Sequence, residues 1–329
     1  MTIAVLGPGG VGGLVAGALD RAGEPVVVVA RAETARLISA HGLRVSSVRL
    51  GDFLAHPRAV AQLEEPVDAL VVATKATGLE QALARVAFTP VPASAGASAP
   101  ASAPASAPAS VSAPAPALVL PLLNGLDHLA LLRARFGEEA VVAGTIRVEA
   151  DRPRPGVVVH TSPFLRIDMA SRFAAARPRM EALAARLEAA GIPARVCESE
   201  PQVLWSKLVR LNALACTTSA FDKLLGEIRD TPALRAALVG AIDEGCAVAN
   251  AEGARIDASD PLGELRDAHA TLGSSMQRDI AAGRPPELDA IPGAVLRAAA
   301  RHGLACPTIE ALVAQIVARA GVPAPLVAR

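Results

Sequence analysis

The sequence predicts two domains: an α/β domain over residues 1–198 and an all-α domain over residues 199–329. Short apolar runs separated by helical segments fill the first part, which is typical of a parallel sheet covered by helices. A glycine-rich turn joins the first apolar run to the first helical segment. From Ser199 onward, apolar residues recur almost entirely at helical spacing. A length of 329 residues also exceeds that of a typical single domain.

The composition favours small molecules or other proteins as partners. The chain carries 32 basic and 32 acidic residues, without a basic stripe for nucleic acid or an acidic tail. No apolar run is long enough and free of charge or Pro to predict a transmembrane helix, and the N-terminus lacks the basic leader of a secretory signal. The chain has four widely spaced cysteines, which we expect to be free packing thiols of a cytoplasmic protein rather than metal ligands: Cys197, Cys216, Cys246 and Cys306.

The first elements form a nucleotide-binding pattern. An apolar run over 2–6 ends in a glycine-rich turn, which an amphipathic helix and a second apolar run over 26–30 follow. The turn matches G-x-G-x-x-G, in which glycines permit a tight turn, close approach of a pyrophosphate, and packing of helix on strand. Because the motif follows the first strand and opens a helix, it predicts a Rossmann-type dinucleotide site. The predicted cofactor-binding residues of the turn are Gly7, Pro8, Gly9, Gly10, Val11 and Gly12.

The end of the second strand indicates which dinucleotide is bound. Arg31 stands where a cofactor with a free ribose 2′-hydroxyl would require Asp or Glu, and an Arg there suits a 2′-phosphate. The sequence therefore predicts NADP(H) rather than NAD(H), and it disfavours FAD for the same missing carboxylate. The alternative is that Arg31 is an ordinary surface cation, because Arg is abundant in this chain.

Polar residues follow two of the next buried strands. The run 68–73 ends at Lys75, and the run 118–122 is followed by Asn124 and a glycine. The carboxyl ends of parallel strands line the ligand crevice, so both side chains are predicted to face it. Lys occurs only at 75, 207 and 223, and Asn only at 124, 212 and 250, which makes either residue informative. A solvated loop Lys and a turn-forming Asn-Gly are the alternatives.

The rest of the first domain contains one segment of different composition. Residues 90–117 are rich in Ala, Ser and Pro and have no charge, so we predict a disordered insertion there. The other predicted elements are a β excursion over 41–56, helices over 79–88 and 173–190, strands over 141–145, 157–161 and 164–168 that complete the sheet with an antiparallel edge, and a strand over 194–197.

The second domain begins with the helix that carries Lys207. Ser199 is a candidate N-cap, with Pro201 at an early helical position. Lys207 lies three residues after Leu204 and four before Leu211, which places it on an apolar stripe. A Lys can release its proton, whereas an Arg is always charged, so an isolated Lys in an Arg-rich chain is a candidate proton donor. Snorkelling of its head into water is the alternative. Further helices are predicted over 232–252, over 265–282, and as a pair around Leu296 and Leu312.

These features, in this order, resemble those of the ketopantoate reductases (2-dehydropantoate 2-reductases). The resemblance covers nearly the whole chain apart from the 90–117 segment. It implies a Rossmann domain followed by an α-helical domain, with the active site in the cleft between them. The residues that carry it are Gly7-x-Gly9-x-x-Gly12, Arg31, Thr74-Lys75, Asn124-Gly125, Trp205-x-Lys207-Leu208, Ser274-Ser275-Met276, and Glu287 with Asp289 and Gly293.

The resemblance also implies an activity and residue roles. NADPH would deliver hydride to the 2-keto carbon of ketopantoate and give pantoate, an intermediate of pantothenate and coenzyme A biosynthesis. Lys207 would be the general acid, which suits an ammonium aimed at a developing alkoxide. The resemblance also implies that Asn124 would contact the substrate and the nicotinamide, and that Ser275 would bind the substrate carboxylate. Glu287 would contact the cofactor ribose or the substrate hydroxyl and hold Lys207 in place. Lys75 and Arg31 would contact NADPH.

The sequence departs from the family pattern beyond Lys207. The family places an Asn four residues after the Lys, but here that position is Leu211 and the Asn is Asn212. A π-bulge near 208–212 would absorb the extra residue and keep Asn212 at the substrate. Ala215 and Cys216 replace a second Asn, so the substrate pocket is altered more than the cofactor pocket. A reductase of another 2-keto acid and a non-catalytic NADP(H) sensor therefore stay open, as does the oligomeric state, for which a homodimer is one candidate.

Overall fold

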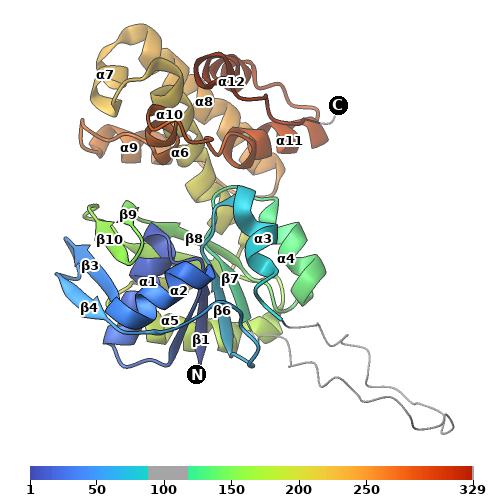
Figure 1. The fold of residues 1–329 in the computed structure, drawn as a ribbon. Helices are drawn as coiled ribbons and strands as arrows, with labels where there is room; N and C mark the ends of the chain where they lie inside the picture. The colour runs from blue at the N-terminus through green and yellow to red at the C-terminus, as the bar shows by residue number, and fades with distance from the viewer. Residues whose placement is uncertain (88–117, 328–329) are drawn as a thin grey trace, which may run out of the picture. The chain divides into compact units, whose positions relative to one another are not determined.

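The computed structural model describes residues 1–87 and 118–327 (Figure 1). The segment 90–117, predicted to be a disordered insertion, lies outside the described residues. The chain divides into two compact units, so that two short segments of the α/β part belong with the helices of the second unit. The first unit comprises Met1–Thr74, Gly78–Leu122 and Leu129–Val196, and the second comprises Lys75–Thr77, Leu123–His128 and Cys197–Arg329.

The first unit is built on a parallel sheet, as the sequence predicts; it has five strands, of which the one over 58–60 was not predicted. Four of the strands are short apolar runs, and on the three central strands every residue is buried because helices cover both faces. Val5 of the first strand pairs with Val28 on one side and Val71 on the other. The strand order is β5 (Arg58–Val60), β2 (Val26–Val29), β1 (Ile3–Leu6), β6 (Ala69–Val72) and β7 (Leu118–Pro121).

The later strands of the first unit form two further sheets. The prediction that they complete the first sheet is wrong for the strand over 157–161, whereas the segment over 141–145 begins with a parallel bridge from Val141 to Val119 and pairs antiparallel with the strand over 166–170. A four-stranded sheet has the order β4 (Phe53–Ala55), β3 (Leu43–Ser47), β10 (Val157–His160) and β9 (Ala150–Arg154), and a three-stranded sheet has the order β12 (Ala194–Cys197), β11 (Arg166–Ala170) and β8 (Ala143–Arg147). Alternation predicts a strand but not its partner. β9 also escaped prediction, because four of its five residues are exposed and give no apolar signal.

Helix α1 (Gly10–Arg21) is buried on more sides than an amphipathic helix would be. It packs on β1 and β2 of the first sheet and also on β3, β4, β9 and β10 of the four-stranded sheet. Two glycines allow the second contact, since a Cβ on Gly13 would lie 2.6 Å from Val158 Cγ2 and one on Gly17 would lie 2.9 Å from Val45 Cγ2. The other helices of this region are α2 (Ala32–His41), α3 (Leu79–Leu83), α4 (His128–Phe136) and α5 (Arg177–Ala189), with short 3-10 turns at Ala76–Gly78 and Ala174–Ala176.

The second unit is helical, and α6 (Glu200–Phe221) is its central element (Figure 1). The Ser199 hydroxyl accepts a hydrogen bond from the Gln202 N–H at 3.2 Å, so the predicted N-cap is confirmed. Among the described residues, no helix combines the length and apolar composition needed to cross a membrane. The remaining elements are α7 (Leu225–Asp230), α8 (Pro232–Ala251), α9 (Ser259–Asp267), α10 (Ser275–Ala281), a π-helical turn (Asp289–Gly293), α11 (Ala294–Arg301) and α12 (Pro307–Ala320).

Candidate active site

The glycine-rich turn of the first unit depends on Gly7 and Gly12 for its shape. Gly7 has φ +92°, and a Cβ there would lie 2.7 Å from Thr74 Cγ2. A Cβ on Gly12 would overlap the carbonyl oxygen of Gly7. The first glycine therefore permits the tight turn and the third permits close packing of α1 on β1, which are the roles that the motif predicts.

Gly9 has a different environment, and it is the position that fits a pyrophosphate. A Cβ on Gly9 would have no protein atom within 4 Å. Gly9 is also the N-cap of α1, and no side chain caps the helix there. The first N–H groups of a helix attract anions, and here they border space that a Cβ would enter without meeting protein. These residues therefore fit a dinucleotide phosphate.

Gly10 has a structural task that the sequence does not reveal. A Cβ on Gly10 would overlap the backbone of Ala150 and Asp151 in β9. This strand, which the sequence analysis missed, therefore lies directly against the start of α1. Pro8 is buried and Val11 is half-buried in the same turn. The six residues predicted for cofactor binding thus divide into those that shape the turn and those that leave room for a ligand.

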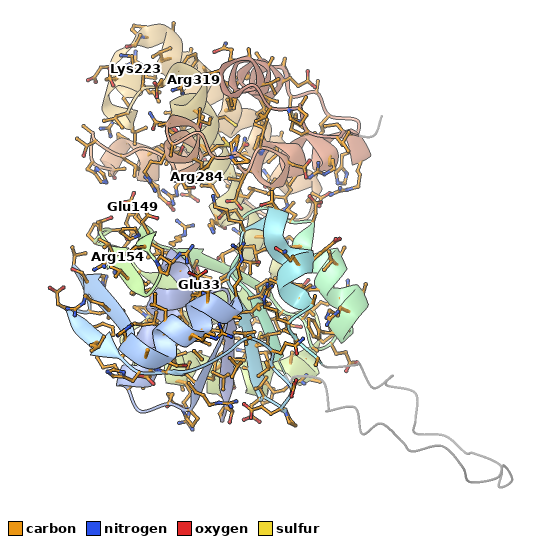
Figure 2. The ribbon with its side chains drawn as sticks, in the orientation of Figure 1. Glu33, Glu149, Arg154, Lys223, Arg284 and Arg319 are labelled. Atoms are coloured by element: carbon orange, nitrogen blue, oxygen red, sulfur yellow. The ribbon has the colours of Figure 1, made fainter. Side chains whose placement is uncertain are left out.

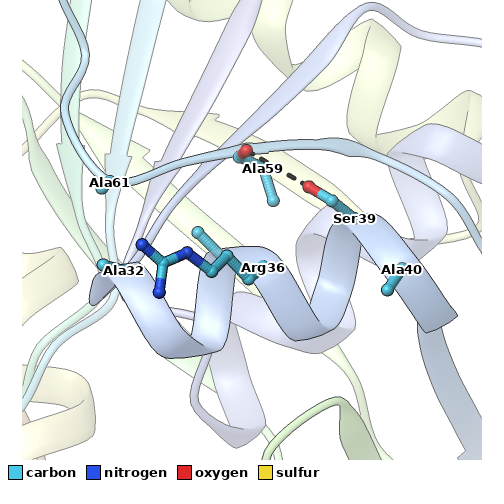
Figure 3. Close-up of a pocket in the computed structure, with 7 residues that line it drawn as sticks. Ala32, Arg36, Ser39, Ala40, Ala59 and Ala61 are labelled. Carbon is cyan, nitrogen blue, oxygen red and sulfur yellow. Dashed lines mark hydrogen bonds between the residues drawn. The ribbon is translucent and has the colours of Figure 1, made fainter.

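Arg31 is exposed at the N-cap of α2, with extended backbone and no helix-capping side-chain bond. A hollow of about 480 Å³ lies between α2 and β5, starting at the next residue, Ala32 (Figure 3). Its lining is mostly alanine, with Arg36 the single charged residue and Ser39 donating a hydrogen bond to the Ala59 carbonyl at 3.4 Å. The Arg31 side chain is therefore accessible from solvent, as binding of a 2′-phosphate would require.

The second unit holds Lys207 in a chain of three polar side chains. The Lys207 ammonium donates to Asn124 Oδ1 at 2.9 Å, and the Asn124 amide nitrogen donates to Glu287 Oε2 at 2.9 Å. The Ala76 backbone N–H donates to the other Glu287 oxygen at 3.4 Å. Glu287 is buried, at 8% exposure, so its oxygens are hydrogen-bonded by these donors rather than by bulk water. Ammonium, amide and carboxylate therefore fix one another's orientation.

A close backbone contact supports this chain. A Cβ on Gly125 would overlap the carbonyl of Ala290, and Gly125 has φ +83°. The loop that carries Asn124 therefore lies against the π-helical turn that begins two residues after Glu287. In the same loop, the Asp127 carboxylate accepts a hydrogen bond from Arg297 at 2.5 Å. The Asn-Gly pair is thus more than a turn former, because only glycine allows this approach.

Lys75 has a buried acidic partner that the sequence analysis did not identify. Its ammonium lies 2.7 Å from Asp279 Oδ2, and Nε of Arg284, which Figure 2 labels, lies 2.9 Å from Oδ1 of the same carboxylate. The Asp279 side chain is 7% exposed, whereas those of Lys75 and Arg284 are 52% and 57% exposed. A buried carboxylate thus binds two cations whose side chains are about half exposed to solvent. The sequence signal was its place one helical turn after Ser275.

His128 is a second residue that sequence reasoning missed. It is the first residue of α4 and is 5% exposed. Burial, and secondarily the positive charge of Lys207, lowers the pKa of His128 to about 4. Its Nε2 is buried and has no hydrogen-bond partner among the described residues. The His128 imidazole is therefore neutral near pH 7, and it lies close enough to Lys207 for the positive charge of that side chain to lower its pKa.

The two serines at the start of α10 differ in environment. Ser274 is buried, accepts a hydrogen bond from the Gln277 N–H at 3.0 Å, and has its hydroxyl oxygen 2.8 Å from that of Thr218. Ser275 is exposed and can meet a ligand. Ser274 is therefore the helix cap, which leaves Ser275 as the candidate for substrate binding.

The predicted π-bulge near 208–212 is wrong. Helix α6 is a regular α-helix from Glu200 to Phe221. Five residues turn a regular helix through about 140°, so Asn212 points away from Lys207. It is fully buried, and its Oδ1 accepts a hydrogen bond from the Cys216 thiol at 3.4 Å. Asn212 therefore has no surface with which to bind substrate, and the π-helical turn lies at Asp289–Gly293 instead.

Both units are parts of a dinucleotide-dependent oxidoreductase: one offers a phosphate-binding turn, and the other an oriented ammonium that can donate a proton. Comparison with known proteins identifies the family. The profile of "Ketopantoate reductase PanE/ApbA" matches residues 3–95 and 98–171, and that of its C-terminal domain matches 201–320. The chain belongs to the ketopantoate reductase family and is an oxidoreductase.

Individual relatives cover nearly the whole chain. A Mycobacterium tuberculosis 2-dehydropantoate 2-reductase is 30% identical over 98% of both chains, and the Bacillus subtilis uncharacterized oxidoreductase YkpB is 28% identical over 96% of this chain and 98% of its own. The solved 2-dehydropantoate 2-reductase of Geobacter metallireducens superposes with a TM-score of 0.81 at 27% identity, covering 96% of this chain and 99% of its own. A D-mandelate dehydrogenase, solved with NADH and anilino(oxo)acetate, has the same fold, with a TM-score of 0.80 at 20% identity over 98% and 99% of the two chains.

Proposed function

We propose that the protein is an NADPH-dependent reductase of 2-keto acids, which transfers hydride to the C2 carbon while Lys207 protonates the oxygen. The observation that carries the proposal is the chain from Lys207 through Asn124 to Glu287. Ketopantoate is the reference substrate, because several relatives are named 2-dehydropantoate 2-reductase. Its reduction would give pantoate for pantothenate and coenzyme A biosynthesis.

The proton is the part of the reaction that this chain's own residues supply. A bound NADPH provides the hydride. As hydride reaches C2, negative charge develops on the keto oxygen, and an oriented ammonium both stabilises that charge and donates its proton. Asn124 accepts one N–H of Lys207 and so directs the others. Glu287 holds the Asn124 amide from the far side, and we assign it the role of orienting the donor.

Cofactor recognition is proposed for the turn and for two cations. Gly9 would admit the pyrophosphate, and Arg31 would bind the 2′-phosphate that distinguishes NADP(H) from NAD(H). Lys75, anchored by Asp279, would place a positive charge on the cofactor side. Ser275 would bind the substrate carboxylate at the start of α10. A homodimer stays a prediction, to be checked by sedimentation or light scattering.

The decisive experiment replaces Lys207. Lys207→Ala should lower kcat with ketopantoate or another accepted 2-keto acid by about 10²–10⁴-fold, the usual effect of losing a general acid. NADPH affinity should change little, as measured by fluorescence titration. Lys223→Ala is the matched control, because Lys223 forms an exposed pair with Glu227 in the same unit. Near-normal turnover of Lys207→Ala would remove Lys207 from the acid role.

Two other candidate functions give different results in the same assay. A reductase of another 2-keto acid would turn over that acid and leave ketopantoate largely untouched. An NADP(H) sensor would bind NADPH tightly and reduce no acid in a panel. The half-buried position of Leu211 on the Lys207 side of α6 favours the first of these two.

A further inference from the structure

Leucines lie one turn before and one turn after Lys207 on the same side of α6. Leu204 lies three residues before Lys207 and Leu211 four residues after it, so the three share one side of a regular helix. All three are half-buried, whereas Trp205, Leu208 and Val209 of the opposite side are buried in the helical core. A molecule that reaches the Lys207 ammonium along this side therefore lies beside leucine methyl groups.

The polar side chains further along α6 are buried or paired within the protein. Asn212 is fully buried and bonded by Cys216. The hydroxyls of Thr217 and Thr218 donate to helix carbonyls one turn back, each at 2.7 Å. Arg210 pairs with Glu264. Arg210 and Thr218, three and eleven residues after Lys207, are the polar residues on the Lys207 side beyond it. Arg210 is paired with Glu264 and Thr218 is fully buried, so both are already engaged within the protein.

The elements near α6 provide polar groups for the carboxylate and keto oxygen of a substrate, but few for its side chain. Asn124 already donates to Glu287 and accepts from Lys207, and Ser275 is the candidate for the carboxylate. The π-helical turn after Glu287 contributes apolar Ala290, Ile291 and Pro292, all of them buried. A keto acid can therefore be held at its carboxylate and keto oxygen, but α6 offers nothing to a hydroxyl on its side chain.

We propose that the preferred substrate is a 2-keto acid with an apolar, branched side chain that carries no hydroxyl group. This inference rests on the proposed function and names its substrate class. The reaction is unchanged: hydride from NADPH bonds to C2, the C=O π pair moves to oxygen, and Lys207 protonates it, giving the 2-hydroxy acid and NADP⁺. The side-chain hydrocarbon lies against Leu204 and Leu211.

A matched pair of substrates tests the inference on the wild-type enzyme. Ketopantoate is 4-hydroxy-3,3-dimethyl-2-oxobutanoate, and 3,3-dimethyl-2-oxobutanoate differs from it only by the missing hydroxyl. A site that binds a hydroxyl rejects the analogue without it by about 10⁴–10⁵-fold, whereas an apolar pocket discriminates weakly. We expect kcat/KM for the apolar acid to exceed that for ketopantoate. A higher kcat/KM for ketopantoate would overturn the inference.

A substitution at Leu211 gives a second, independent readout. Leu211→Asn should shift the kcat/KM ratio toward ketopantoate by about tenfold or more, because it places an amide one turn from Lys207. Leu211→Met, which keeps the side chain apolar, should leave the ratio unchanged. An unchanged ratio in a folded Leu211→Asn enzyme would exclude this side of α6 from the substrate site. NADPH oxidation with neither acid, nor with a wider 2-keto acid panel, would instead refute the proposed function.

Discussion

The buried imidazole of His128 predicts a specific loss of stability in acid. Its pKa is lowered from 6.5 to about 4 in the folded protein. Between these values the unfolded chain binds a proton that the folded chain does not, so the free energy of unfolding must fall as the pH falls. The slope is about 1.4 kcal/mol per pH unit, which gives a loss of about 3 kcal/mol between pH 6.5 and pH 4.

The chain contains a convenient probe for this measurement. Trp205 is its single tryptophan, is 1% exposed, and lies in α6 two residues from Lys207. Its fluorescence therefore reports unfolding of the unit in which Lys207 affects His128. Urea unfolding should be followed in this way at several pH values between about 7 and 4.5, a range that brackets most of the predicted loss.

Substitution separates His128 from the other groups that titrate. His128→Gln keeps a buried polar side chain but cannot bind a proton, so its unfolding free energy should fall less steeply in acid than that of the wild type. His56→Gln removes an exposed His and should retain the wild-type slope. Burial also lowers the pKa of His160, so part of the slope should survive in both variants. Equal slopes for His128→Gln and the wild type would refute the reasoning.

Two further predictions concern the cofactor. Arg31→Asp should lower the ratio of kcat/KM with NADPH to that with NADH by about tenfold or more, because a charge-assisted bond to the 2′-phosphate is lost; Arg36→Asp, the same charge change further along α2, should alter it less, and equal ratios in Arg31→Asp and the wild type would dismiss the assignment. Gly9→Ala should weaken NADPH binding without lowering the melting temperature, since its Cβ meets no protein atom. Gly10→Ala should lower the melting temperature through overlap with β9, and the opposite pattern would contradict the division of roles within the turn.

The sequence predicts those features that depend on neighbouring residues. Apolar runs such as the four valines of β2 form strands wherever helices cover them, and the Ser199 cap needs only the N–H three residues later. Partner choice is a long-range property, so the four-stranded and three-stranded sheets did not follow from alternation. β9 gave no apolar signal, yet it fixes the identity of Gly10 through backbone contact.

The same distinction applies to the candidate site. Lys207, Asn124 and Glu287 were predicted individually, and the structure joins them by hydrogen bonds. The prediction for Asn212 failed because it required a π-bulge to bring Asn212 to the position that the family's Asn occupies. Helix α6 is regular instead, so the Asn212 side chain lies in the core. Asp279 and His128 were missed because the burial of a carboxylate or an imidazole depends on long-range packing; the one local sign for Asp279 was its place one helical turn after Ser275.

The three lysines show that a rare residue type can indicate candidate functional residues. In a chain that uses Arg for almost every cation, each Lys invites the expectation of a task that Arg cannot perform. Lys75 and Lys207 stay candidates for such a task, since one is paired with the buried carboxylate of Asp279 and the other bonds the half-buried Asn124, which buried Glu287 holds. Lys223 does not, because its exposed pair with Glu227 is one that Arg could form equally well. Rarity selects candidates, and the burial of the partner decides between them.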